Sequence, residues 1–125
     1  LMRAYSINTH YEYPQNIFEI GEIFRIENGK IQEEVNLSVG ICHEKANFTE
    51  CKEILNSFFE NLGIEYDIEE KERKYFIKGR AGSILIDGKQ IGYIGEIHPQ
   101  ILSNWNIGMP VAIFEINLNE VYKRV

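Results

Sequence analysis

The sequence has 125 residues, 44% of them hydrophobic, which suits one domain with one core. Its 13 basic and 19 acidic residues give a net charge of −6, whereas proteins that bind nucleic acid on their own usually carry a basic surface, so strong RNA binding by this chain alone is not expected. No run of 18 apolar residues and no signal-peptide pattern occurs, and Cys42 and Cys51 form neither a disulfide framework nor a metal-ligand spacing. We therefore expect a soluble, cytoplasmic protein with buried free thiols.

The first half of the chain predicts a hairpin followed by a helix. Tyr5 to Asn16 has no clear period and is interpreted as an entry segment that crosses the domain surface. Apolar residues in 17–26, the turn Asn28-Gly29 and alternation in 35–41 predict two paired strands, with both faces of the first strand partly covered. Asn47 as a cap, apolar residues at helical spacing and Gly63 then predict a helix over 48–62.

The second half predicts more strands and two short helices. Residues 66–72 are expected to be a strand that fades into a solvated connection, and residues 75–77 to return to the core. Asp87-Gly88 predicts a tight turn between strands at 81–86 and 91–96. Pro99 predicts a short helix over 99–105 that ends at Gly108, followed by a strand at 111–117 and a final short helix. The order indicates an α+β fold, an antiparallel sheet with helices on one side.

Few residues qualify for chemistry. No glycine-rich loop leads into a helix, and His43 beside Cys42 lacks the further ligands that zinc requires. Cys51 falls on the apolar face of the predicted helix, where packing is a simpler role than nucleophilic catalysis.

A second group of polar residues lies between positions 80 and 98. Glu96 and His98 could share a strand face and move a proton, but a helix cap at His98 and an ion pair at Glu96 explain them more simply. Arg80 could bind an anion, or could hold a carboxylate such as Glu96 or Glu115.

Five short motifs, taken in order, resemble the beta subunit of phenylalanyl-tRNA synthetase, closest to its archaeal and eukaryotic branch, over nearly the whole chain. The motifs are Pro14-x-x-Ile17-Phe18-Glu19-Ile20-Gly21, Ala46-Asn47-Phe48-Thr49, Gly79-Arg80-Ala81, Ile91-Gly92-x-Ile94-Gly95-Glu96-Ile97-His98-Pro99 and Pro110-Val111-x-x-Phe114-Glu115.

The resemblance implies that residues 1–125 are a single domain, the C-terminal part of a degenerate class II synthetase catalytic-like fold. The start at Leu1 fits a domain cut from a longer protein. In that family the alpha subunit of an alpha2-beta2 heterotetramer attaches phenylalanine to its tRNA with ATP and magnesium, and the beta copy serves assembly and tRNA placement. The domain itself would hold no cofactor, no metal and no catalytic residue. The candidate structural or interface residues are Phe18, Glu19, Gly21, Gly79, Arg80, Gly95, Glu96, His98 and Pro99.

The resemblance also contains a test of activity. Active class II enzymes hold ATP with an arginine in a Phe-Arg-x-Glu strand and a second arginine in a glycine-containing strand-helix segment. Residues 24–27 match the first pattern, but residues 111–125 contain no glycine and carry Glu115 and Asn117 instead, so Arg25 is not assigned a catalytic role. The alternative hypothesis is a small freestanding enzyme or ligand-binding domain with a cleft around Arg25, Arg80 and Glu96.

Overall fold

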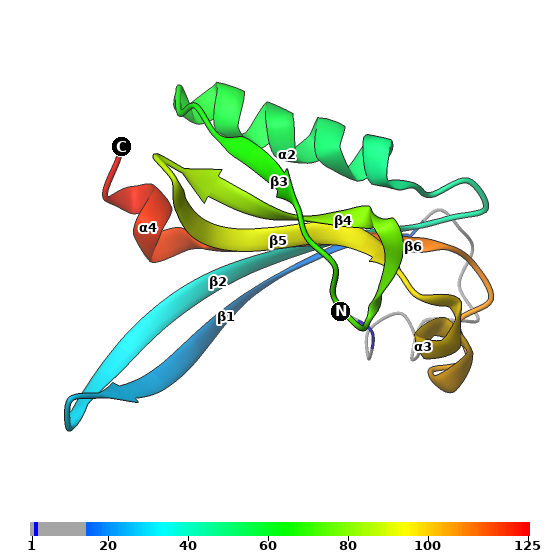
Figure 1. The fold of residues 1–125 in the computed structure, drawn as a ribbon, viewed down its shortest axis with the longest axis horizontal. Helices are drawn as coiled ribbons and strands as arrows, with labels where there is room; N and C mark the ends of the chain where they lie inside the picture. Colours follow the sequence, from blue (N-terminus) through cyan, green and yellow to red (C-terminus); the bar gives the residue numbers. More distant parts are fainter. Residues whose placement is uncertain (1, 3–14) are drawn as a thin grey trace.

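The computed structural model of the chain describes residue 2 and residues 15–125, so the entry segment expected before Gln15 lies almost wholly outside the described residues. Figure 1 labels the helices and strands. They are β1 (Gln15–Glu27), β2 (Lys30–Cys42), α2 (Phe48–Leu62), β3 (Asp67–Glu70), β4 (Phe76–Ile86), β5 (Lys89–Ile97), α3 (Pro99–Asn104), β6 (Val111–Asn117) and α4 (Leu118–Tyr122).

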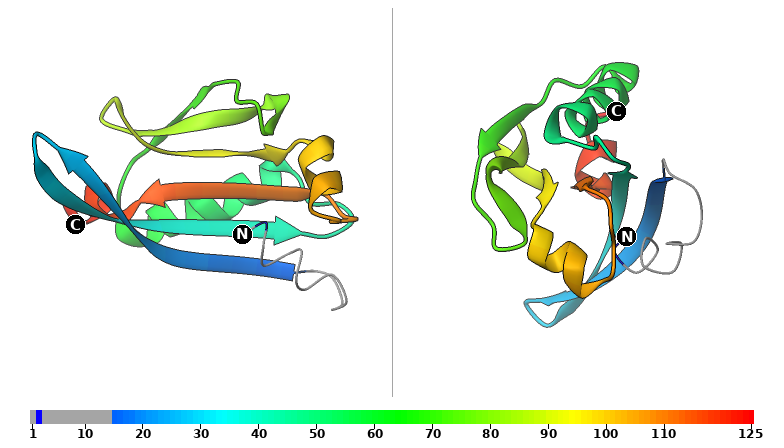
Figure 2. Two further views of the ribbon diagram at one scale, coloured as in Figure 1. Left: turned by 90° about the horizontal axis from the view of Figure 1, so that it is seen from below. Right: turned by 90° about the vertical axis from the view of Figure 1, so that its right-hand side faces the viewer.

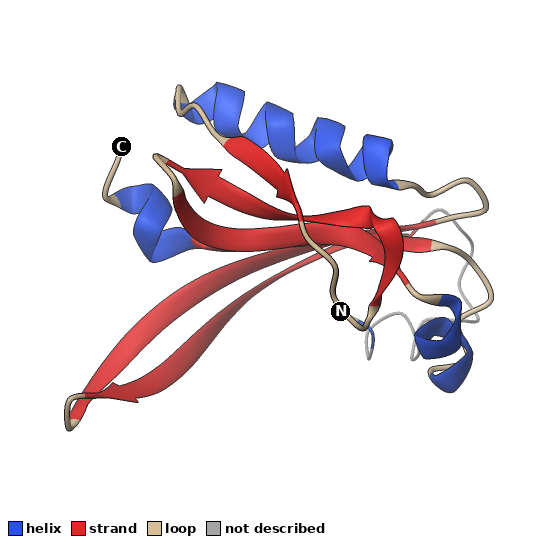
Figure 3. Ribbon diagram, in the orientation of Figure 1, coloured by secondary structure: helices blue, strands red, loops and turns tan. Residues whose placement is uncertain are grey.

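The six described strands form one sheet in the order β1-β2-β6-β5-β4-β3, and every neighbouring pair is antiparallel. Figure 2 shows the strands side by side, with β6 inserted between the two hairpins. Figure 3 shows the helices against this sheet. The predicted α+β class with an antiparallel sheet is confirmed.

Two tight turns build the hairpins. Asn28 and Gly29 have φ values of 51° and 75°, and Asp87 and Gly88 have values of 51° and 78°. Two consecutive left-handed residues match the right-handed twist of the flanking strands, and Asn, Asp and Gly adopt them at the lowest cost. Both turns lie where the sequence predicts them, although the strands extend beyond their predicted ends.

Helix α2 has the bounds that its cap residues predict. Asn47 Oδ1 accepts a hydrogen bond from the Glu50 N–H at 2.9 Å, and Gly63 ends the helix with a φ of 69°. Its apolar face buries Cys51, Leu55 and Phe59 against β5 and β6. This packing fixes which face of the sheet the helix covers.

The sheet carries a hydrophobic cluster on each face. The cluster under α2 includes Phe114 and Ile116 of β6, whereas the opposite cluster includes Val111 and Ile113 of the same strand together with Ile101 and Leu102 of α3. Because alternate residues of a strand point to opposite faces, α3 packs on the side away from α2. The prediction that the helices share one side is therefore wrong for α3, because sequence spacing does not specify to which face a helix returns.

The end of α3 also differs from the prediction. The helix stops at Asn104 with Trp105 as its cap, and the left-handed residue that follows is Asn106, with a φ of 56°. Gly108 has no left-handed angle. Asparagine tolerates this conformation because its short polar side chain bonds locally, so the helix ends earlier than a glycine-based stop suggests.

The β1–β2 hairpin projects beyond the rest of the sheet (Figure 1). Five apolar side chains on one of its faces are 64% to 79% exposed and define the hairpin strip, namely Phe18, Ile20, Phe24, Ile26 and Ile31.

Register places this strip on the α2 side of the sheet. Phe18 lies opposite Val39 and Ile20 opposite Leu37, and both partners pack against the α2 cluster. The predicted cover over this face of the first strand is wrong for the described part of the chain, because α2 contacts β5 and β6 instead.

Candidate functional site

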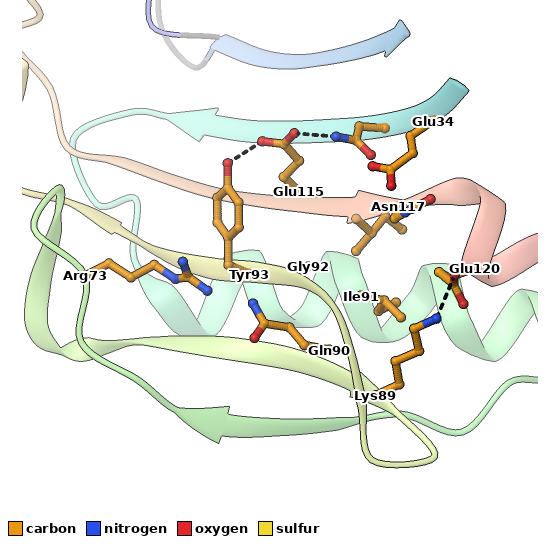
Figure 4. Close-up of a pocket in the computed structure, with 12 residues that line it drawn as sticks. Glu34, Arg73, Lys89, Gln90, Ile91, Gly92, Tyr93, Glu115, Asn117 and Glu120 are labelled. Carbon is orange, nitrogen blue, oxygen red and sulfur yellow. Dashed lines mark hydrogen bonds and ion pairs between the residues drawn. The ribbon is translucent and has the colours of Figure 1, made fainter. Parts of the chain in front are cut away.

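A polar pocket opens on the sheet near β2, β5 and β6, and Figure 4 shows its side chains. Its volume is about 450 Å³. It is lined by Glu34, Asn36, Arg73, Lys89, Gln90, Ile91, Gly92, Tyr93, Glu115, Ile116, Asn117 and Glu120.

Tyr93, Glu115 and Asn36 form a chain of hydrogen bonds across three strands (Figure 4). Tyr93 lies directly opposite Glu115 in the β5–β6 register, and its hydroxyl donates to the Glu115 carboxylate. Asn36 Nδ2 donates to the other carboxylate oxygen at 3.1 Å. Burial, and then the bond to Glu115, raises the pKa of Tyr93, so its phenol remains a proton donor at neutral pH. This arrangement suits a structural network better than proton abstraction.

Arg73 borders the same pocket from the β3–β4 connection. Its guanidinium carbon lies 5.1 Å from the centre of the Tyr93 ring, which provides a cation–π contact. Its Nε and Nη2 are buried and have no hydrogen-bond partner. Covered guanidinium nitrogens are normally hydrogen-bonded, so Arg73 is an exception, and the contact that the structure shows for its guanidinium is the Tyr93 ring.

The far end of the pocket is closed by ion pairs on α4. Lys89 and Lys123 reach Glu120 at 3.0 Å and 3.1 Å (Figure 4 shows the first pair). Lys89 and then Lys123 lower the pKa of Glu120 to about 2. Glu120 is thus a fixed anion that joins α4 to the second hairpin rather than a general acid.

A second, more apolar pocket of about 590 Å³ lies between α3 and the ends of β4 and β5. Arg80 Nη1 and Glu96 Oε1 meet there at 3.2 Å, so the structure contains the arginine–carboxylate pair that the sequence suggests. Glu96 is buried and Arg80 is largely exposed. Glu96 is therefore the buried partner of this pair, and Arg80 is the partner that faces solvent.

The candidate residues beside this pair shape the local backbone. His98 caps α3, its Nδ1 accepting from the Gln100 N–H at 3.1 Å, and Pro99 is the first helical residue. A Cβ on Gly95 would stand 2.6 Å from the Phe76 ring, and Gly79 has a φ of 79°. Each of these four residues permits a local conformation or close approach.

Phe18, Glu19 and Gly21 lie far from this pair, on the edge strand β1. Arg25 is opposite Gln32 of β2, whereas Glu96 is opposite Ala112 of β6, which in turn is opposite Ile41 of β2. Gln32 and Ile41 are nine residues apart on β2, which corresponds to about 30 Å along an extended strand. The alternative hypothesis of a ligand-binding cleft requires Arg25 to lie beside Arg80 and Glu96. The structure brings Arg80 and Glu96 together but places Arg25 at the other end of the sheet.

The histidine and cysteine candidates have other contacts. His43 Nε2 is 2.6 Å from Glu50 Oε2, and His43 Nδ1 accepts from the Lys45 N–H at 3.2 Å. Both cysteines are buried, and burial followed by the charge of Glu50 raises the pKa of Cys51 to about 12. Within residue 2 and residues 15–125, no group of three or more His, Cys, Asp or Glu residues could hold a metal ion.

Sequence reasoning missed the Tyr93–Glu115–Asn36 network and the Glu120 ion pairs. Tyr93, Glu115 and Asn36 come from three strands, so only the strand order brings them together. The Lys123–Glu120 pair has a local signal, a separation of three residues on a helix, whereas the Lys89–Glu120 pair has none. Among the described helices, none is long and apolar enough to cross a membrane.

The fold and pockets define an α+β domain with an antiparallel sheet. The polar side chains of these two pockets form hydrogen bonds and ion pairs mainly with one another. The family model for the phenylalanyl tRNA synthetase beta chain CLM domain matches residues 1–118. The chain belongs to the phenylalanyl-tRNA synthetase beta chain family.

Individual relatives agree with this family. Proteins called phenylalanine–tRNA ligase beta subunit are 53% identical in Thermococcus sibiricus and 52% identical in Pyrococcus furiosus, over 98% of this chain. The relative of that name in Methanococcoides burtonii is 38% identical over 96% of the chain. The chain spans 22% to 23% of the length of these relatives.

Proposed function

We propose that this chain is a non-catalytic assembly domain of a phenylalanyl-tRNA synthetase beta subunit, in the C-terminal, catalytic-like part of that subunit. It supports ATP-dependent attachment of phenylalanine to tRNA by an alpha subunit in an alpha2-beta2 heterotetramer. The similar proteins carry the name of the ligase's beta subunit, which supports this parent complex.

The strand order supports a degenerate class II fold. A long hairpin, β1–β2, lies next to β6, and β6 passes directly into α4 through the cap Asn117. This matches the hairpin and the strand-helix segment that the sequence resemblance implies. On β6, Glu115 bonds to Tyr93 and Asn36, so its side chain occupies the face where an active enzyme requires open space for nucleotide.

The hairpin strip is the observation that carries the assembly role. It continues the α2 side of the core onto a strand that no described helix covers. Contiguous exposed apolar groups of this kind mark interaction sites, and long unpaired edge strands are normally covered. A subunit or domain of the parent complex is the cover that we propose.

The division of labour follows from this role. ATP and magnesium act in the alpha subunit, whereas this domain positions that subunit and holds neither. In the pocket of Figure 4, Glu120 pairs with Lys89, and Glu115 bonds to Tyr93 and Asn36, which suits a scaffold.

The test places Phe18→Ser and Ile20→Ser in the full-length beta subunit, co-expressed with alpha. We expect loss of the heterotetramer, measured by size-exclusion chromatography with light scattering, because two side chains of the hairpin strip no longer bury apolar area. Aminoacylation should fall with assembly, while the ATP affinity of the alpha subunit stays unchanged.

The matched control changes Glu22 and Glu33 to serine on the same hairpin face. Both are exposed polar residues, so assembly should remain normal. Normal assembly of the Phe18→Ser/Ile20→Ser protein would refute the assembly role of the strip. Circular dichroism of the purified variant separates lost assembly from lost folding.

Calorimetry provides a separate check of the non-catalytic role. Neither ATP nor phenylalanine should bind the beta subunit at this domain. ATP binding that disappears with Arg25→Ala would instead support the freestanding ligand-binding alternative.

A further inference from the structure

The connection from β3 to β4, together with the first residues of β4, carries an unusual local charge. Five of the chain's 13 basic residues and one of its 19 acidic residues lie in the ten-residue segment 71–80, in a chain of net charge −6. We call this segment the basic hairpin; its cations are Lys71, Arg73, Lys74, Lys78 and Arg80. The negative net charge of the whole chain does not reveal this local excess of basic residues.

Backbone hydrogen bonds hold the basic hairpin in place. The Lys71 N–H donates to the Ala81 carbonyl at 3.2 Å and closes the segment, while the Phe76 N–H donates to the Arg73 carbonyl at 3.1 Å. The His98 N–H donates to the Tyr75 carbonyl at 2.8 Å and ties the tip to the start of α3, beside which the segment turns (Figure 1). The cations are therefore gathered before any partner arrives, which lowers the entropy cost of binding.

Most of these cations are not held in a close ion pair with a carboxylate of the same chain. Among the described residues, Lys71, Arg73 and Lys74 form no ion pair with a carboxylate. Lys78 and Glu72 are 3.8 Å apart and both well exposed, so water screens that pair strongly.

The basic hairpin also lacks an apolar centre. The large exposed hydrophobic residues of the described chain include none from this segment, and its Phe76 is buried. Protein–protein interfaces usually centre on buried apolar or aromatic anchors and are depleted in lysine. Contacts to a phosphate backbone instead use lysine and arginine with few apolar groups.

We propose that the basic hairpin docks the phosphate backbone of RNA, an inference that rests on the proposed function because the tRNA substrate of the parent ligase supplies the RNA. The contact is electrostatic and independent of base sequence. It adds to binding by other parts of the enzyme, since a net charge of −6 opposes RNA binding by this chain alone.

The experiment uses the assembled synthetase with Lys71→Glu and Lys74→Glu in full-length beta. Anisotropy of a fluorescent tRNA transcript is measured between about 50 and 200 mM salt. We expect about tenfold weaker binding at low salt, and a slope of log affinity against log salt reduced by about two, one for each lysine. The neutral variant Lys71→Gln/Lys74→Gln should lose less.

Lys30→Glu with Lys52→Glu is the matched control. Both lysines are exposed and distant in sequence from the basic hairpin, and the substitution changes the net charge equally. Equal weakening by the two charge reversals, or no weakening by either, would overturn the inference. Binding of polyglutamate is measured on the same enzymes. Loss of polyglutamate binding by the Lys71→Glu/Lys74→Glu enzyme, with unchanged tRNA binding, would overturn the inference in favour of an acidic protein partner.

Assembly and ATP-dependent activation of phenylalanine are measured on the same samples. Both should be normal in the Lys71→Glu/Lys74→Glu enzyme. Wild-type tRNA binding by that enzyme refutes the RNA contact alone, whereas normal assembly of the Phe18→Ser/Ile20→Ser enzyme refutes the assembly role alone.

Discussion

Gly92 lies where β5 comes very close to β6. A Cβ added there would stand 1.9 Å from the Glu115 carbonyl oxygen. That oxygen belongs to the backbone of a central strand, so relief requires displacement of the β5–β6 pairing. We expect Gly92→Ala to lower the free energy of unfolding by about 3 kcal/mol, measured by urea denaturation of the purified chain.

Gly108→Ala is the control for this substitution. Its added Cβ meets nothing within 4 Å and its backbone is not left-handed, so the change should stay within about 0.5 kcal/mol. Equal losses at the two positions would show that the close approach at Gly92 is not the cause.

Residue-level prediction from sequence succeeds where the signal is local. His98 is predicted as a cap from the proline beside it. For Arg80 the sequence leaves Glu96 and Glu115 open as carboxylate partners, and the structure selects Glu96. The Gly92 contact depends on Glu115 of β6, which lies more than twenty residues further along the chain, so the amino-acid pattern alone does not reveal it.

At the scale of elements, α4 depends on its ion pairs with the second hairpin. Lys89 and Lys123 lower the pKa of Glu120 from 4.5 to about 2. The unfolded carboxylate therefore takes up a proton at a higher pH than the folded one, so the stabilisation is complete above pH 4.5 and lost as pH falls toward 2.

Comparison of the chain with its Glu120→Gln variant measures this effect. We expect the chain to be more stable by about 1 kcal/mol at neutral pH, because both lysines are well exposed and screened by water. The difference should vanish as the pH approaches 2 in denaturant titrations. A difference that is constant over this range would contradict the assigned ion pairs.

The elements themselves are largely predictable. Helix α2 and strand β6 have their predicted bounds, because Asn47, Gly63 and the alternation along β6 are signals within the element. The side of the sheet that α3 covers is not predictable in this way. It depends on contacts of Ile101 and Leu102 with residues from other strands.

At the scale of the whole molecule, β6 joins two hairpin units. It pairs with β2 on one side and β5 on the other, and its side chains belong to both hydrophobic clusters. A chain that ends at Pro110 lacks this strand. We expect it to show no cooperative urea transition and to lose most of its strand signal in circular dichroism.

A chain that ends at Tyr122 is the matching truncation. It keeps β6 and the buried side chains of Leu118 and Val121, so it should retain a cooperative transition. A normal transition for the chain that ends at Pro110 would mean that the two hairpin units fold independently.

The position of β6 also affects how the chain folds during its synthesis. Asn36 on β2 and Glu115 on β6 are 79 residues apart, yet they bond across neighbouring strands. A ribosome that has released the first hairpin, α2 and the second hairpin has not yet released the strand that unites them. The edges of β2 and β5 that pair with β6 therefore stay unpaired until β6 is released, so folding during synthesis includes a late step in which β6 joins the two hairpins.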